Sequence, residues 1–408
     1  GLAEMADMGI HWIRVQAPWR EVEPVNRTPD QYNWRRWDAR VQGAAAEDME
    51  LMFTLAGNPS WAAQYAMGPV TDTADLLEFL GAAVERYDGD GIDDAPGSPV
   101  VTYWEIYNEP DNAAPWYAEH GGYGYFGHNG AGYAALLDAI YPVVKAANPR
   151  AQVVFGGVAH DNFEQSGGAF DKEFVDDVLR NCAGPCFDVM NYHYFPFYRF
   201  RWESYGKDII GKANYFSDLL ADYGFECPMI CSETTWAGIG WGTPAMQARY
   251  VTLVYVRGIA AELMTVDWYA LTDIDPTLPG LLDNDYQPKL AYYAYRTLTE
   301  QLGSVRYRRA LTTQELGEEN LEGYMFEALV DGAFERLDIV WYDCPSLKQA
   351  PPQDCPGDYQ TMMVVADVVK VTDLYGNERL VQDEDDDMLD GKVTLNITAD
   401  PVYIDYKP

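Results

Sequence analysis

The 408-residue sequence is poor in basic residues and lacks an apolar run long enough to cross a membrane. It has 28 Lys and Arg against 64 Asp and Glu, a formal net charge of −36. A surface this acidic repels phosphate backbones, so no nucleic acid partner is expected and anionic polysaccharides are disfavoured. Because a membrane helix needs about 20 apolar residues, no membrane span is expected either. The sequence carries no signal for an oligomeric state.

Zinc motifs are also absent, because the cysteines form no CxxC pair and lack histidine partners at zinc-site spacings. The six cysteines are Cys182, Cys186, Cys227, Cys231, Cys344 and Cys355. The first two enclose a tight loop and the last two a proline-rich loop, so each of these pairs can close a disulfide. The middle two flank the start of a predicted strand and lie about 13 Å apart, beyond disulfide reach. This cysteine usage favours a secreted location, either extracellular or periplasmic.

Strands and helices alternate from residue 11 to about residue 300. The strand-like runs are 11–17, 51–56, 100–107, 152–158, 187–194, 228–234 and 266–272. Amphipathic helical stretches such as 73–87 and 133–147 separate them. This alternation predicts an α/β fold with parallel strands, and its spacing predicts a (β/α)8 TIM barrel. A doubly wound open sheet is the competing fold, but no glycine-rich phosphate loop follows any strand.

Only seven barrel strands can be counted, because residues 1–9 have a helical pattern. The first strand is therefore expected upstream of Gly1. After Gly303 the sequence changes to short alternating runs separated by turn residues, which is typical of an antiparallel β-sandwich. The predicted organisation is a catalytic barrel over residues 1–302 and a C-terminal β-sandwich domain over residues 303–408.

Two glutamates, Glu105 and Glu109, lie in the run V-V-T-Y-W-E-I-Y-N-E-P-D at residues 100–111. The run is a predicted strand, which places the two residues about 13 Å apart. Paired carboxylates in glycosidases lie about 5–5.5 Å apart in retaining enzymes and about 6.5–9.5 Å apart in inverting ones. The two are therefore not a catalytic pair. Glu109 closes the strand, where barrel enzymes place their chemistry, whereas Glu105 is expected inside the barrel as a structural partner.

The partner of Glu109 must come from the end of another strand. Glu233, in M-I-C-S-E-T-T-W, closes a strand in the same way. Asp273 and Asp275, after the last barrel strand, are weaker candidates.

With these residues in place, the sequence resembles clan A glycoside hydrolases, the 4/7 superfamily, in a family 39-like or family 5-like form. W-E-I-Y-N-E-P resembles the acid/base motif at the end of strand 4, and Glu233 occupies the nucleophile position at the end of strand 7 when a first strand is counted. The segment G-N-P-S-W-A is also similar to family 39-like members. The resemblance covers about residues 1–300, and the C-terminal segment resembles the β domain that often follows such barrels.

The resemblance implies a retaining O-glycoside hydrolase that cleaves a neutral or weakly charged glycan by double displacement, with no cofactor required. Glu109 would be the general acid/base and Glu233 the nucleophile, whose charge would raise the pKa of Glu109. Asn108 would bind the sugar 2-hydroxyl, and Arg14 would hydrogen-bond Glu233 and keep it ionised.

Further binding residues also follow from the resemblance. His193 matches a histidine that the clan often places on strand 6. A tyrosine often follows two residues later; Phe195 stands there, so Tyr194 or Tyr192 is expected to substitute. Trp268 would form the floor under the sugar.

Aromatic side chains, which suit the faces of sugars, are abundant in the strand-end loops. They include Trp61, Trp116, Tyr117, Tyr123, Tyr125, Phe126, Phe197, Tyr198, Trp202, Trp236 and Trp241. Packing within the loops is the alternative for each of them.

Two other functions remain open from the sequence. One is a catalytically silent carbohydrate-binding or surface scaffold protein on the same fold, which the presence of both glutamates disfavours. The other is a transglycosylase, which would use the same residues with a different acceptor.

A metal site is also predicted in D-G-D-G-I-D-D. Asp88, Asp90 and Asp94 place hard oxygen ligands around glycines, which suits a structural calcium ion, although the spacing is not that of an EF-hand. An ordinary acidic turn is the alternative, and the sequence slightly favours it.

Overall fold

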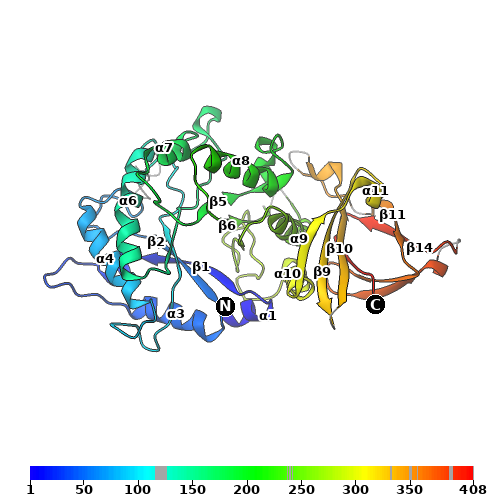
Figure 1. Cartoon of the computed structure of the whole chain (residues 1–408), viewed down its shortest axis with the longest axis horizontal. Coiled ribbons are helices and arrows are strands. Elements are labelled where there is room, and N and C mark those ends of the chain that lie inside the picture. The colour runs from blue at the N-terminus through cyan, green and yellow to red at the C-terminus, as the bar shows by residue number, and fades with distance from the viewer. Residues whose placement is uncertain are drawn as a thin grey trace.

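The computed structural model describes residues 1–114, 126–236, 238, 240, 242–330, 333–348, 352–355, 357–385 and 389–407 (Figure 1). The N-terminal part contains parallel strands that alternate with helices. These strands are β1 (Trp12–Pro18), β2 (Glu50–Ala56), β3 (Tyr103–Ile106), β4 (Gln152–Val154), β5 (Met190–Tyr194), β6 (Met229–Thr234) and β7 (Val266–Trp268). Each of the seven predicted strand runs therefore overlaps an observed strand.

The helices of this part surround the strands (Figure 1). They are α1 (Leu2–Asp7), α2 (Trp19–Val22), α3 (Arg35–Ala46), α4 (Thr73–Arg86), α6 (Gly130–Ala147), α7 (Phe174–Asn181), α8 (Asp208–Asp222), α9 (Pro244–Ala260) and α10 (Leu290–Leu302), with the 3-10 turns η1 (Glu164–Ser166) and η2 (Pro196–Arg201). Their sequences explain the packing. In α4, for example, Asp72 accepts a hydrogen bond from the Ala74 N–H at the N-cap, and Leu76, Phe79, Leu80 and Val84 form one buried face.

The strands belong to two parallel sheets that isolated bridges connect. The pairing orders are β1-β2-β3-β4 and β5-β6-β7, all parallel. Isolated bridges from Val154 to Val189 and from Val158 to Tyr192 join the two sets. Strand β2 is buried over nearly its whole length, as expected for a strand covered by helices on one side and by the barrel interior on the other.

No strand among the described residues lies between β7 and β1, so the barrel stays open at this position. A cavity of about 820 Å³ extends from this opening to the carboxyl ends of the strands. Its walls include Trp12 and Ile13 on one side and Val266 on the other. The source of a strand at this position stays a prediction.

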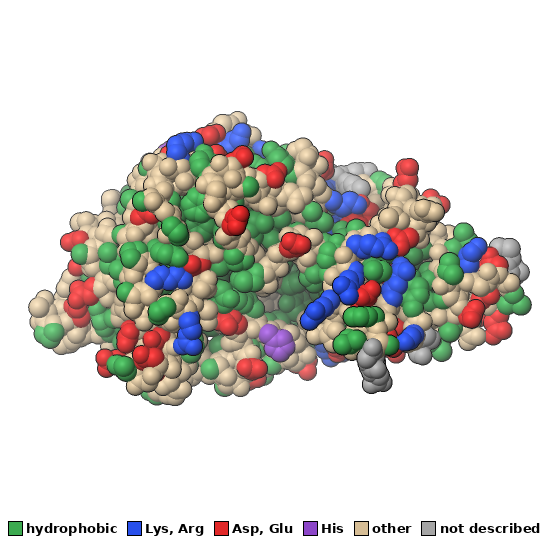
Figure 2. Space-filling model, viewed as in Figure 1, with side chains coloured by type: hydrophobic (Ala, Val, Ile, Leu, Met, Phe, Trp, Pro, Cys, Tyr) green, Lys and Arg blue, Asp and Glu red, His purple; other side chains and the backbone are tan. Residues whose placement is uncertain are grey.

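The C-terminal part contains antiparallel strands. They are β8 (Val305–Ala310), β9 (Leu321–Val330), β10 (Ala333–Tyr342), β11 (Tyr359–Val365), β12 (Val368–Thr372), β13 (Glu378–Gln382), β14 (Lys392–Thr398) and β15 (Val402–Asp405), with α11 (Thr313–Leu316), η3 (Pro345–Lys348) and η4 (Asp383–Asp385). A six-stranded sheet in the order β13-β12-β15-β10-β9-β8 packs on the pair β11-β14 through a shared apolar core. Figure 2 shows lysine and arginine side chains gathered over this part of the molecule.

The two parts share an apolar cluster. Val251 and Tyr295 of α9 and α10 lie in one buried group with Phe326 and Trp341 of β9 and β10. Arg257 of α9 also forms an ion pair with Glu322 of β9, with Nη2 and Oε2 2.8 Å apart. The β domain therefore packs directly against the helices that precede and follow β7.

The cysteine predictions are confirmed. Disulfides join Cys182 to Cys186 and Cys344 to Cys355, while Cys227 and Cys231 are unpaired thiols. None of the helices in the described ranges is both long enough and apolar enough to cross a membrane.

Candidate active site

Glu109 projects from the carboxyl end of β3 on a turn with unusual backbone angles. Tyr107 has φ of 64° and Glu109 has φ of 47°, in the left-handed region that non-glycine residues seldom adopt. Two hydrogen bonds hold this turn: the Tyr107 N–H donates to the Leu55 carbonyl at 3.0 Å, and the Glu109 N–H donates to the Gly157 carbonyl at 2.9 Å. Strand β2 and the loop after β4 thus compensate for the strained backbone and fix the direction of Glu109.

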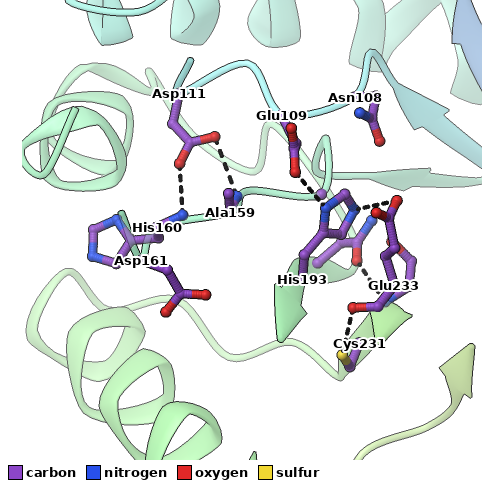
Figure 3. Close-up of polar contacts among 12 residues, drawn as sticks. Asn108, Glu109, Asp111, Ala159, His160, Asp161, His193, Cys231 and Glu233 are labelled. Carbon is purple, nitrogen blue, oxygen red and sulfur yellow. Dashed lines mark hydrogen bonds and ion pairs between the residues drawn. The ribbon is translucent and has the colours of Figure 1, made fainter. Parts of the chain in front are cut away.

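His193, at the end of β5, lies between two glutamates (Figure 3). Its Nδ1 is 3.0 Å from Glu109 Oε1, and its Nε2 is 3.8 Å from Glu233 Oε2. One ligand atom from each of the three side chains can be chosen so that all lie within 4.8 Å of one another. A separation this short is close to the carboxylate spacing of about 5–5.5 Å in retaining glycosidases, and shorter than that of inverting ones.

Arg14, on β1, binds mainly to Glu105 rather than to Glu233. Its Nε and Nη2 donate to the two oxygens of Glu105 at 2.7 and 2.9 Å, whereas Nη1 donates to Glu233 Oε2 at 3.3 Å. Nη2 also donates to Asn108 Oδ1 at 2.6 Å. Glu105 is fully buried and accepts a further bond from the Gly157 N–H at 2.9 Å. The structural role predicted for Glu105 is confirmed.

Burial dominates the electrostatics of the site. It raises the pKa of Glu109 to about 7, although Arg14 and Lys212 act in the opposite direction. Burial also raises the pKa of Glu233, against the effects of His193 and Arg14. The pKa of His193 falls to about 4 for the same reason, so its imidazole is neutral near pH 7.

Two electrostatic expectations need correction. The main cause of the raised Glu109 pKa is desolvation and not the charge of Glu233. Arg14 does contact Glu233 and lowers its pKa, but desolvation by burial outweighs this effect, so the pKa of that carboxyl stays above its usual value.

The predicted binding residues fall into two groups. Arg14, Asn108 and Trp268 line the same cavity as Glu109 and Glu233. Trp61 instead donates its Nε1–H to the Glu23 carbonyl at 3.1 Å and packs edge-on against Trp19.

Trp236 is buried against Tyr250 and lines a different cavity, beside the β domain. The prediction for Tyr194 is wrong. Tyr194 is 0% exposed and its hydroxyl donates to Asp208, so it does not face a ligand, and Tyr192 is equally buried.

Of the loop aromatics, Phe126 and Trp202 are buried, as loop packing would require. Five others lie outside the described residues: Trp116, Tyr117, Tyr123, Tyr125 and Trp241.

The structure adds residues that the sequence did not single out. Tyr269, directly after β7, lines the cavity beside the two glutamates. Asp111 is fully buried two residues after Glu109, and Lys212 is fully buried on α8. Lys212 could have been noticed, because it occupies a position on the apolar face of α8 between Ile209 and Phe216, which are both buried.

The three aspartates of the predicted calcium site do come together. One carboxylate oxygen from each of Asp88, Asp90 and Asp94 lies within 4.8 Å of the others. Backbone N–H groups of the loop already use some of these oxygens: the Asp90 N–H donates to Asp88 and the Gly91 N–H to Asp94, at 3.0 and 2.9 Å. The loop precedes β3, at the barrel end opposite Glu109, so an ion here would be structural.

Removing divalent cations tests that prediction. With calcium bound, a chelator is expected to lower the melting temperature, because binding to the folded state alone stabilises it. Calorimetry with and without added Ca²⁺ measures the effect, and Asp94→Asn should abolish it. An unchanged melting temperature would show that the loop is an ordinary acidic turn.

No family model and no curated protein matches the sequence. Among solved structures, a family 39 glycoside hydrolase from the gut symbiont Bacteroides cellulosilyticus WH2 is similar over 100% of this chain and 77% of its own, with 19% identity and a TM-score of 0.73.

Two further structures are similar over almost the whole chain. A glucosidase from Croceicoccus marinus has 13% identity and a TM-score of 0.66, covering 99% of this chain and 91% of its own. A monomeric β-xylosidase from Caulobacter crescentus CB15 has 12% identity and a TM-score of 0.63, covering 100% of this chain and 92% of its own. These similarities confirm the predicted TIM barrel with a C-terminal β domain. The chain therefore has the same fold as solved glycoside hydrolases of family 39.

Proposed function

We propose that the protein is a retaining O-glycoside hydrolase that cleaves a neutral or weakly charged glycan. The observation that carries the proposal is the pairing of Glu109 and Glu233 across His193, with carboxylate oxygens within 4.8 Å, at the carboxyl ends of β3 and β6. Active sites of barrel enzymes occur at this face. The similarity in fold to a glucosidase and a β-xylosidase supports the same class of reaction.

In this mechanism Glu233 attacks the anomeric carbon while Glu109 gives its proton to the leaving oxygen. The covalent glycosyl-enzyme is then hydrolysed by a water that Glu109 deprotonates, and the product keeps its configuration. The raised pKa of about 7 suits Glu109 to both steps, because it can be protonated in the first and accept a proton in the second. Arg14 orients Asn108 through its 2.6 Å hydrogen bond, and Asn108 is proposed to bind the sugar 2-hydroxyl.

The surroundings of the pair support a sugar ligand. Trp268 and Tyr269 line the cavity beside Glu233 and supply aromatic surface for a sugar face. The acidic protein surface disfavours an anionic glycan. The two disulfides support a secreted or periplasmic location, where polysaccharides are available as substrates.

The alternatives differ in how the site would behave. A silent scaffold has no need of a partly buried glutamate whose pKa is raised to about 7 beside a second partly buried glutamate, so the site favours the enzyme. A transglycosylase would use the same two glutamates, and only the acceptor that reaches the glycosyl-enzyme would differ.

The stereochemistry of the product tests the proposal. An aryl glycoside and polysaccharide screen first identifies a substrate. Proton NMR at early times should then show the same anomeric configuration in the first-formed sugar as in the substrate, before mutarotation. An inverted first product would contradict the double-displacement mechanism, and a transferred sugar in place of a free one would identify a transglycosylase.

A further inference from the structure

Behind the glutamate pair lies a buried lysine that the mechanism does not use. Lys212 is 0% exposed, and its ammonium donates three hydrogen bonds. The acceptors are Asp161 Oδ2 at 2.9 Å, the His193 carbonyl at 2.7 Å and the Ala159 carbonyl at 2.5 Å. Asp161, also buried, accepts a further bond at 2.8 Å from Trp202 Nε1. Lys212 therefore connects α8 to the end of β5 and to the loop after β4.

The loop after β4 is held from its other side by Asp111. Asp111 Oδ2 accepts from the His160 N–H at 2.8 Å, and Oδ1 accepts from the Ala159 N–H at 3.3 Å (Figure 3). Asp111 lies on the same turn as Glu109, two residues later. The loop consequently joins the turn that carries Glu109 to the strand end that carries His193, with Lys212 and Asp111 as the two connections.

We propose that Lys212 and Asp161 form a positioning pair, which holds His193 against Glu109 and sets the net charge beside the Glu109 carboxyl. The proposal rests on the proposed function, because it gives the pair a purpose in the acid/base step. A pair buried only for stability is unfavourable, since desolvating two charges offsets most of their attraction. Because His193 connects it to the Glu109 carboxyl, the same pair gains a role that an apolar pair of equal volume would lack.

The two members of the pair act on Glu109 with opposite sign. The positive charge of Lys212 lowers the pKa of Glu109 and the negative charge of Asp161 raises it. Arg14 on β1 also lowers it and Glu105 on β3 also raises it.

Among the described residues, the other titratable groups around Glu109 are Asp111 on its own turn, His193 on β5, Glu233 on β6 and Tyr269 after β7. None of them is altered chemically when either member of the pair is replaced.

The test is a titration of Glu109 in variants of the pair. Asp161→Asn keeps Lys212 and its two carbonyl acceptors, so the midpoint of Glu109 should fall by about half a pH unit or more. Lys212→Met should move it upward. Carbon-13 NMR of labelled glutamate carboxyls measures the midpoint, and Glu109→Gln identifies the signal by its loss. The basic limb of kcat/KM should move in the same directions.

A matched pair elsewhere in the barrel supplies the control. Lys145 Nζ lies 2.8 Å from Asp188 Oδ2 and also donates to the Ala151 carbonyl at 2.5 Å. Lys145 lies on α6, and Asp188 lies just before β5, at the end of the strand opposite His193. Asp188→Asn and Lys145→Met should leave the Glu109 midpoint unchanged. They therefore show whether loss of an ion pair, through lower stability alone, can shift the Glu109 midpoint.

The double variant Lys212→Met with Asp161→Asn separates position from charge. It restores neutrality, so the Glu109 midpoint should return toward its original value, but the connection to His193 stays broken and kcat should remain about tenfold or more lower. If Lys212→Met does not fold, comparing the Glu109 midpoints of Asp161→Asn and Asp188→Asn still tests the proposal. An unmoved midpoint in Asp161→Asn, or a downward shift in Lys212→Met, would overturn the proposal.

The NMR titration does not require turnover. A protein without glycosidase activity would refute the proposed function while the midpoints still reported on the pair.

Discussion

Glu233→Ala should abolish turnover, lowering kcat by roughly 10⁴–10⁶-fold, as removal of a covalent nucleophile does in other enzymes. Glu233 closes β6 and directs one carboxylate oxygen toward His193 Nε2 at 3.8 Å and Arg14 Nη1 at 3.3 Å. No other carboxylate among the residues that line this cavity stands in the same relation to Glu109, because Asp267 lies within β7 and not at its end. Steady-state kinetics on the best aryl glycoside measures the loss.

The fold of this variant should be retained. Arg14 keeps its two short bonds to Glu105, so removing Glu233 leaves no uncompensated buried cation. Glu226→Ala is the matched control, since Glu226 is an exposed glutamate just before the same strand, β6, at the opposite end from Glu233. Full activity in Glu233→Ala, or an equal loss in Glu226→Ala, would refute the assignment of the nucleophile.

The strand ends could be predicted from the sequence because two local rules combine there. Apolar runs mark buried parallel strands, and such strands meet at one edge of the barrel. Glu109 and Glu233 therefore came together in the prediction although they lie far apart in the sequence. Glu105 could be separated from the pair for the same reason, since four residues along a strand exceed the spacing of catalytic carboxylates.

The electrostatics could not be predicted in the same way. Which carboxylate Arg14 binds depends on side-chain geometry inside the barrel, where Glu105 offers both oxygens and Glu233 only one. Tyr194 follows His193 by one residue, and on a strand that places it on the opposite face, toward Asp208. The alternation of side chains along a strand therefore excludes Tyr194 from the side of the sheet that His193 faces. The resemblance to a family motif had suggested the opposite.

The roles of Asp111, Asp161 and Lys212 depend on contacts between loops. In the sequence, Asp111 could be recognised only as the residue after a proline, and Asp161 only as part of the loop after β4. Their partners, the N–H groups of the loop after β4 and the ammonium of Lys212, lie about 50 residues away in the sequence. Sequence periodicity contains no information about such pairings, so only the structure identifies them.

The pH dependence of kcat/KM should lose its basic limb when Glu109 is replaced. Glu109 acts as an acid only while protonated, so the rate of the first step falls as pH rises through its pKa of about 7. In Glu109→Ala no group acts as the titrating acid. The value of kcat/KM on an activated aryl glycoside should therefore stay level as pH rises through about 7. A basic limb that persisted in the variant would assign the acid to another residue.

Glu109→Ala should also separate substrates by their leaving groups. A poor leaving group needs the proton of Glu109 at the glycosidic oxygen, so its cleavage should slow by about 10²–10⁴-fold. An activated aryl group departs without that proton, so its glycosyl-enzyme should still form and then accumulate, because no base remains to activate water. Azide is a nucleophile that needs no base, and it fits the space that the carboxylate leaves beside His193. Adding azide should therefore restore turnover of the aryl substrate and yield a glycosyl azide with the configuration of the substrate. An equal loss on both kinds of substrate, with no response to azide, would show that Glu109 positions the substrate instead of transferring the proton.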